Sequence, residues 1–245
     1  MSTDLASYLS EHGLDEHREY LMGIARPSVE IITGTARVSM GCSKFGGSPE
    51  LPTDFNWPQH KFGTYRFIGQ VNLADIPNGR HALPSSGLLS FFYAHDENGE
   101  SFWGDPDYVR VYLFDKPDAL TLVEPPAAVC MGSTATLKFQ LGADVPPWPW
   151  DKSAAKRWPI SEDQRDAYWD LRLRLHPSRR YLLGYPFNTT LAYDPTPGPE
   201  WRSFLTVSSN DELEWCWHDG DWLVTFIEEH RLRAGDFSEI KSDAG

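Results

Sequence analysis

The spacing of hydrophobic positions changes along the chain, and it predicts where helices give way to strands. Near the N-terminus, Leu5 and Leu9 recur at helical spacing, Gly13 interrupts the pattern, and Pro27 ends it. We therefore expect a helical hairpin or one broken helix near residues 4–25.

A second helix is predicted near residues 161–176. Ser161 and Gln164 have the spacing of a capping box, in which a hydroxyl and an amide three residues apart satisfy free N–H groups at a helix start. Leu171 and Leu175 then continue one apolar face of the helix.

The remaining pattern is that of β-strands. Short runs rich in β-branched and aromatic residues recur, and Gly, Pro, Asn and Asp separate them. The expected strands are 29–33, 36–40, 66–73, 88–94, 109–114, 120–123, 136–141, 202–208, 213–217 and 222–228. The pattern predicts one α+β domain over residues 1–245, mainly β, with antiparallel strands. Residues 241–245 are small or charged and are expected to fray.

A weak internal repeat indicates how the strands are grouped. In the first half, a strand starting at Phe67 precedes a second one 21 residues later; in the second half, a strand starting at Ser203 precedes one 19 residues later. A true repeat predicts two similar β halves, about 27–142 and 180–240, that share a core. Chance similarity between β-hairpins is the alternative.

Composition excludes several classes of protein. The chain has 245 residues, with 22 Lys and Arg against 35 Asp and Glu, so its formal net charge is −13. Nucleic-acid binders need the opposite sign to meet phosphates, so we expect no nucleic-acid partner. No apolar run approaches the ~18–20 residues that span a bilayer, and no signal peptide is recognisable. We expect no membrane association and a cytoplasmic location, where Cys42, Cys130 and Cys216 remain free thiols.

The motifs that would carry catalysis are incomplete. The glycine-rich run at residues 41–48 resembles a phosphate-binding loop, but Gly47 stands where that loop needs its Lys. Pro49 follows where a helix should open. A tight glycine turn is therefore the better interpretation, and no nucleotide cofactor is predicted.

Two His-Asp pairs invite comparison with metal sites. His95-Asp96 and His218-Asp219 lie at the ends of expected strands, where neighbouring side chains point to opposite faces and chelate poorly. An Asp that forms a turn beside a surface His explains each pair. We predict no metal site and no cofactor.

Two amides in the expected strand 66–73 are harder to explain as surface residues. Gln70 and Asn72 share one face because side chains alternate, and Val71 lies on the other face, the better candidate for the main core. Polar side chains on an inner face need hydrogen bonds, to protein or to a ligand. The two amides therefore belong either to a structural network or to a ligand site.

Aromatic residues are abundant, with ten Trp, ten Tyr and 13 Phe. Several Trp lie beside Pro, Gly or acidic residues, as in Trp57-Pro58 and Trp103-Gly-Asp105. A Trp in a loop can stack on a ligand or a partner, or it can close the end of a β structure.

Several motifs that occur in one order carry a family resemblance. They are Ser43-Lys-Phe-Gly-Gly-Ser-Pro49, Trp57-Pro58, Phe67-Ile-Gly-Gln-Val-Asn-Leu73, Leu83-Pro-Ser-Ser-Gly-Leu-Leu-Ser-Phe-Phe92, Leu182-Leu-Gly-Tyr-Pro186 and Trp217-His-Asp-Gly-Asp-Trp222. Over about residues 25–240 the chain resembles the YwqG-like family, a bacterial domain of unknown function. The C-terminal motifs depart from that pattern. The resemblance implies a mainly β, roll-like fold with peripheral helices, and it implies no reaction, cofactor or ligand.

Two functions from different classes remain open. The incomplete catalytic motifs, the net charge and the Trp-rich loops favour a non-catalytic binding protein, immunity-like toward a basic protein partner. The alternative is an enzyme or a small-ligand receptor with a cleft between the two β halves. The candidate binding residues are Trp57, Gln70, Asn72, Tyr93, His218 and Asp219.

Overall fold

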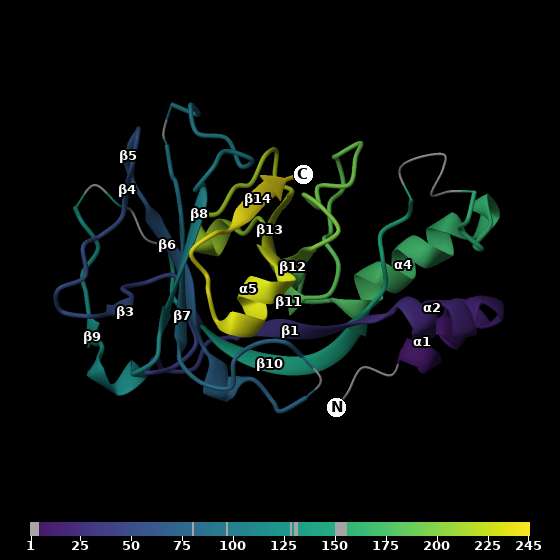
Figure 1. Ribbon diagram of the computed structural model, residues 1–245, viewed down its shortest axis with the longest axis horizontal. Helices are drawn as coiled ribbons and strands as arrows, with labels where there is room; N and C mark the ends of the chain where they lie inside the picture. The colour runs from purple at the N-terminus through teal and green to yellow at the C-terminus, as the bar shows by residue number, and fades with distance from the viewer. Residues whose placement is uncertain (1–4, 80, 97, 128, 130–131, 150–155) are drawn as a thin grey trace.

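A single large antiparallel sheet dominates the protein (Figure 1). The structure is a computed structural model, and it describes residues 5–79, 81–96, 98–127, 129, 132–149 and 156–245. Within these residues ten strands follow one another in the order β14-β13-β12-β11-β1-β10-β2-β6-β7-β8. Every neighbouring pair is antiparallel, so the expected mainly β, α+β fold is confirmed.

The elements have the following bounds. The large sheet contains β1 (Arg26–Gly34), β2 (Lys44–Phe45), β6 (Arg66–Asn72), β7 (Leu88–Tyr93), β8 (Val109–Phe114), β10 (Ala135–Asp144), β11 (Arg180–Leu183), β12 (Trp201–Ser208), β13 (Trp222–Glu228) and β14 (Lys241–Ala244). Two small ribbons pair β3 (Glu50–Leu51) with β9 (Thr121–Leu122) and β4 (Gln59–His60) with β5 (Gly63–Thr64). The α-helices are α1 (Leu5–Glu11), α2 (Arg18–Ile24), α4 (Arg165–Leu175) and α5 (Glu229–Ala234).

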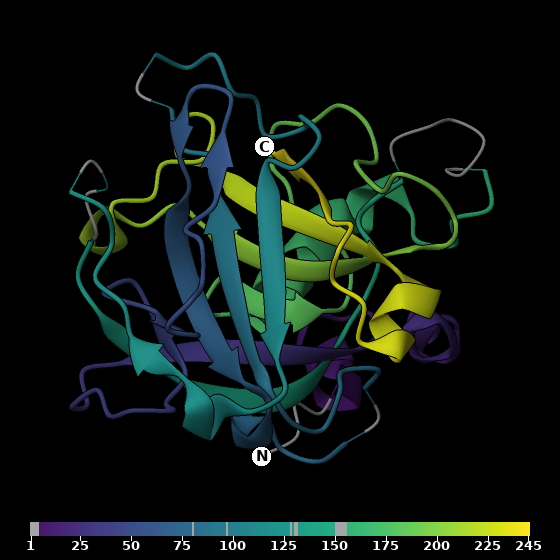
Figure 2. The ribbon, with the colours of Figure 1, turned by 60° about the vertical axis from the view of Figure 1, so that its left-hand side comes forward.

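The long strands β1 and β10 form the bend of the sheet. They pair in register from Arg26 opposite Asp144 to Gly34 opposite Thr136, and they curve beneath the core (Figures 1 and 2). Strands β6 to β8 make one wing of the sheet, and β11 to β14 make the other. The two wings belong to one continuous sheet.

The wings face each other across the main core. Phe91 on β7 and Phe204 on β12 have ring centroids 5.5 Å apart. Alternation sends the next residue, Phe92, to the other face of β7, where Trp57 covers it at 5.4 Å. Both faces of β7 are therefore buried, which explains why its residues are apolar or aromatic except for Ser90.

A second, smaller core lies under the helices. The break predicted at Gly13 separates α1 from α2, and Gly13 has a φ of +68°. The buried side chains of this core are Leu5, Leu9, Leu14, Leu21, Val145, Ile160, Tyr168, Leu171 and Leu175. The predicted apolar faces of both helical segments are thus buried in this second core. They cover one end of the sheet, whereas the main core is formed by the strands.

The expected capping box does not form. The Ser161 hydroxyl lies 3.0 Å from Gln164 Oε1 and makes no bond to a backbone N–H group. Residues 162–164 form a 3₁₀ turn, and α4 begins at Arg165, later than predicted. The Gln164 side chain is instead held by the first helical segment, because its Oε1 lies 2.9 Å from His17 Nε2 and its Nε2 donates to Glu16 Oε1 at 2.8 Å.

The prediction of a strand at 213–217 is wrong. Asp211–Leu213 form a 3₁₀ turn that the Asn210 side chain caps by accepting from Leu213 N at 2.9 Å. Glu214 and His218 then take positive φ values of 54° and 49°, which no strand accommodates. Alternation of burial survives nonetheless, because the Trp residues on both sides of the exposed Cys216 are buried.

The expectations for 36–40 and 241–245 also fail. Residues 36–40 form no strand, whereas Lys241–Ala244 are not frayed and form β14. Strand β13 has a free edge there, and Ser242 and Ala244 are 8% and 2% exposed beside it. Pairing with that edge orders a segment whose own composition carries no strand signal.

The cysteines agree with the expectation where the structure describes them. Cys42 and Cys216 are free thiols. Cys130 lies outside the described residues.

Candidate functional site

Gln70 lies in a buried layer on the outer face of β6. It pairs with Ser90, which shares a face of β7 with Phe92, so its amide points away from the space between the wings. Its Nε2 donates to Cys42 O and to Glu50 Oε1, both at 2.9 Å, and its Oε1 accepts from Glu50 N at 3.0 Å. The amide is fully buried, and its contacts are all with protein groups.

Asn72 and Glu50 hold the same glycine-rich segment against β6. Glu50 accepts from Gly41 N at 2.7 Å, and its carboxylate lies 3.4 Å from Lys44 Nζ in an almost fully buried ion pair. Asn72 Nδ2 donates to Gly41 O at 2.8 Å, and its Oδ1 accepts from Ala74 N. These bonds satisfy the amide groups of Gln70 and Asn72 and give the buried Glu50 carboxylate its partners, whereas the buried Ser90 hydroxyl opposite Gln70 has no hydrogen-bond partner in the described residues.

Trp57 closes this layer from outside. Its Nε1 donates to Tyr65 O at 2.8 Å, and its ring packs edge-on against Phe92. The indole N–H is thus hydrogen-bonded to the backbone, and the apolar ring packs against the core. The arrangement is the plugging role that a loop Trp can take in a β structure.

Tyr93 lies at the far end of β7, in the main core. It is 4% exposed, and its ring centroid is 4.8 Å from that of Trp217. Burial raises the pKa of Tyr93 to about 12. The phenol therefore stays protonated at neutral pH and cannot serve there as a general base.

His218 and Asp219 follow Trp217 onto the surface at the same end of the sheet. His218 Nδ1 lies 3.7 Å from Asp219 Oδ2 and 3.6 Å from Asp221 Oδ2, and its ring is 5.3 Å from that of Trp103. The Asp219 side chain is 95% exposed. The backbone at His218 is left-handed, with a φ of 49°, so the chain turns directly after Trp217.

Segments far apart in sequence meet around His218. Ser242 Oγ donates to Trp103 O at 2.6 Å, and Tyr193 OH donates to Asp243 Oδ2 at 2.6 Å. Thr190 donates to Asp221 at 3.0 Å. We call this surface the acidic rim. It comprises Phe102, Trp103, Asp105, Tyr193, His218, Asp219, Asp221 and Asp243.

In the part of the chain that the structure describes, no Lys or Arg pairs with the carboxylates of the acidic rim. Among the described residues, none of its four carboxylates lies within 4 Å of a Lys or Arg nitrogen. Two of its aromatic side chains are largely exposed, Phe102 by 58% and Tyr193 by 51%. Anionic groups and apolar rings are therefore presented side by side.

The structure divides the six sequence candidates into two groups. Tyr93, His218 and Asp219 come together at the end of the sheet that carries the acidic rim. The buried layer on the outer face of β6 contains the other three candidates, Trp57, Gln70 and Asn72. Sequence reasoning missed Phe102, Tyr193, Asp221 and Asp243 as members of one surface. The recurrence of Trp beside Asp at Trp103-Gly-Asp105 and Trp217-His-Asp219 was the available signal.

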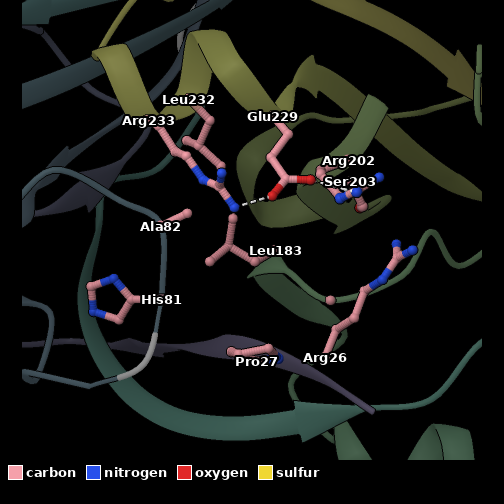
Figure 3. Close-up of a pocket in the computed structure, with 11 residues that line it drawn as sticks. Arg26, Pro27, His81, Ala82, Leu183, Arg202, Ser203, Glu229, Leu232 and Arg233 are labelled. Atoms are coloured by element: carbon pink, nitrogen blue, oxygen red, sulfur yellow. Dashed lines mark hydrogen bonds and ion pairs between the residues drawn. The ribbon is translucent and has the colours of Figure 1, made fainter. Parts of the chain in front are cut away.

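A separate pocket of about 450 Å³ lies between the wings at the opposite ends of β12 and β13 (Figure 3). Its lining comes from β1, β11, β12, α5 and the loop that contains His81. None of the six sequence candidates lines it. Its basic residues are scattered singly along the chain, so no local pattern marks them.

In the described part of the chain, no group of three or more His, Cys, Asp or Glu side chains is arranged to hold a metal ion. No helix in those residues is both long and apolar enough to cross a membrane.

The protein is an antiparallel β roll that carries an acidic, aromatic rim and a basic pocket. The family described as "Domain of unknown function (DUF1963)" matches residues 43–243. The chain therefore belongs to the DUF1963 family. No curated protein matches the chain closely enough to count as a relative.

Proposed function

We propose that this chain is a YwqG-like, non-catalytic binding protein of the bacterial cytoplasm that docks a basic protein partner on its acidic rim. The observation that supports the proposal is that no Lys or Arg of the described residues lies within 4 Å of the four rim carboxylates, beside exposed Phe102 and Tyr193. Immunity-like neutralisation of a basic partner is one activity of this kind.

Charge and apolar surface have separate roles in such docking. The net charge of −13 steers a basic partner toward the protein and raises the association rate. Exposed aromatic rings then provide the contacts that slow dissociation, because aromatic side chains dominate binding hot spots. Phe102 and Tyr193 are the candidates for these anchors.

The alternative, an enzyme or receptor with a cleft lined by Gln70 and Asn72, gains no support from their contacts. Both amides are engaged by the backbone or by Glu50. The pocket that does lie between the wings is lined by other residues.

The proposal can be tested by affinity capture from extracts of the source cells, with two matched variants. The rim variant carries Phe102→Ser and Asp219→Asn, whose side chains are largely exposed. The control carries Leu122→Ser and Glu162→Gln, which remove an exposed apolar group and a charge elsewhere. Captured proteins are identified by mass spectrometry, and their isoelectric points are calculated.

We expect one basic protein on the wild type and the control, reduced about tenfold or more on the rim variant. Its retention should fall as salt rises from about 0.1 to 1 M, because the Debye length shrinks from about 10 to 3 Å. Equal capture by the rim variant, an acidic partner, or a wild-type protein that stays alone under several growth conditions would each contradict the proposal.

A further inference from the structure

The pocket between the wings is a concave site with an unusual charge for this protein. Arg26, Arg202 and Arg233 line it together with a single carboxylate, that of Glu229. Three guanidinium groups against one carboxylate leave an excess of two positive charges, in a chain whose net charge is −13. The volume of about 450 Å³ lies in the usual range for small-molecule sites.

Glu229 occupies only one side of the pocket. Its two carboxylate oxygens bind Arg202 and Arg233, as the dashed line to Arg233 shows in Figure 3. Arg202 also donates from Nη1 to Pro199 O at 2.8 Å and to Trp201 O at 2.9 Å. These bonds hold the Arg202 guanidinium at the wall of the pocket.

Arg26 and Glu229 both line the pocket, and no described carboxylate pairs with Arg26. Its guanidinium carbon is 4.0 Å from the centroid of the Tyr185 ring, and the ring holds it by a cation–π contact. Among the described residues, no carboxylate lies within 4 Å of the Arg26 guanidinium. A fork of N–H donors is thus fixed in place and unused, in the geometry that suits carboxylate or phosphate.

The backbone beneath Arg26 is rigidly supported. Asp144 is fully buried and accepts from Tyr185 N at 2.8 Å. Gly184 has a φ of +71°, and a Cβ there would lie 2.8 Å from Asp144 Oδ2. The turn that carries Tyr185 can therefore approach Asp144 only with glycine, and it presents the aromatic ring that positions Arg26.

Apolar side chains complete the lining. Pro27, Ala82, Leu183 and Leu232 lie around the same space. His81 joins them at the edge opposite α5, with its Nε2 3.3 Å from Pro77 O. The pocket thus combines a few fixed polar groups with an apolar wall, the usual composition of a small-ligand site.

We propose that this pocket binds a small organic anion, with its phosphate or carboxylate group on Arg26 and its carbon skeleton against the apolar wall. The proposal is independent of the basic partner, because the pocket and the acidic rim lie at opposite ends of β12 and β13. Glu229 lowers the positive potential of the pocket and limits the affinity for anions.

Isothermal titration at low salt tests the proposal with three small probes: glycerol 3-phosphate, butyrate and uncharged glycerol. We expect at least one of the two anions to bind and glycerol not to bind. Binding of only one anion identifies phosphate or carboxylate as the recognised group. Arg26→Gln should weaken the binding about tenfold or more, because it removes the bidentate donor.

Two further variants separate this role from a structural one. Glu229→Gln removes the competing carboxylate and should strengthen anion binding about threefold or more, an outcome that loss of structure cannot produce. Arg165→Gln removes an exposed Arg on α4 and should leave the binding unchanged. The proposal is overturned if neither anion binds the wild type with a dissociation constant below about 10 mM, which corresponds to a binding free energy of about −2.7 kcal/mol. It is also overturned if Arg26→Gln, with its fold intact by circular dichroism, binds as the wild type does, or if Glu229→Gln weakens the binding.

Discussion

Individual hydrogen bonds fix the positions of the polar side chains in this chain. Gln70 illustrates this, because each of its amide atoms has a partner, on Cys42 O or on Glu50. The buried Lys44–Glu50 pair depends on the same network. Such a cluster stabilises the fold only while all its members are satisfied.

The first prediction therefore concerns Gln70. Gln70→Ala should lower the free energy of unfolding by about 1–3 kcal/mol, because Glu50 N and Cys42 O lose their partner in a buried layer. Urea denaturation midpoints measure the loss. Gln59→Ala, at an exposed position of β4, should change stability by less than about 0.5 kcal/mol. A loss at Gln70 no larger than at Gln59 would show that the network is not structural.

A second prediction at this scale concerns Asp144. Burial alone raises the pKa of Asp144, but the charges of His176 and Arg172 and the bond from Tyr185 N outweigh it, so the pKa lies below the ordinary value of 3.8. A carboxyl whose pKa is lowered by folding contributes stability above its unfolded pKa and loses it as the pH falls through the folded value. The stability of the wild type should therefore fall with pH below about 4, in part through Asp144.

Asp144→Asn tests this contribution. The variant should be less stable at pH 7 by more than about 1 kcal/mol, since a charged acceptor of buried N–H groups is lost. The difference between variant and wild type should narrow between about pH 4 and pH 2. Urea titrations between pH 7 and pH 2 measure both the loss of stability at pH 7 and its decrease at low pH. If the unfolding free energies of variant and wild type differ by the same amount at every pH down to 2, Asp144 is not a source of the pH dependence.

Secondary-structure elements followed the hydrophobic pattern when they were long and periodic. Strands β6, β7, β8, β12 and β13 lie where alternation and aromatic content predicted them, and α1, α2 and α4 lie near the predicted helices. Strands such as β2 and β11 were not predicted, because two to four residues carry no measurable period. Partners in the sheet decide whether such segments become strands.

Strand β14 gives a prediction at the scale of elements. Deleting residues 241–245 removes the pairing of Ala244 with Leu223 and of Ser242 with Thr225, and it uncovers the edge of β13. We expect a loss of at least about 2 kcal/mol in unfolding free energy, because buried apolar surface and ladder hydrogen bonds are lost together.

Hydrogen exchange provides the control for this truncation. In the full chain the amides of β13 should exchange slowly, whereas in the truncated chain those that face β14 should exchange fast. Lys241→Gln, at an exposed position of β14, should keep the protection. Equal exchange in the full and truncated chains would mean that β14 contributes nothing to the sheet.

The whole molecule is held together by the bend of one sheet. In the bend, strand β1 pairs with β10, which leads through β2 to the first wing, and on its other edge with β11 of the second wing. Phe91 and Phe204 then meet across the core. Neither wing has a complete core of its own, so the two should fold as one cooperative unit.

Cutting the chain tests this cooperativity. A fragment of residues 1–149 lacks β11 to β14, so it exposes the β1 edge and the apolar face of β7. It should show no cooperative thermal transition by circular dichroism, whereas the full chain shows a single transition that coincides with loss of Trp fluorescence. A sharp transition in the fragment would mean that the first wing is an independent domain.

The sequence by itself determined the class of fold, because alternation, aromatic runs and helical spacing are local properties that survive in the tertiary structure. It also determined the charge that the proposed docking uses. The tertiary structure decided which polar groups meet. Gln70 found its partners on the glycine-rich segment, and Asp219 joined residues from three distant segments. Arg26 came to face a pocket built largely from the other wing. No local pattern carries that information, because the bend of the sheet brings together residues more than a hundred positions apart.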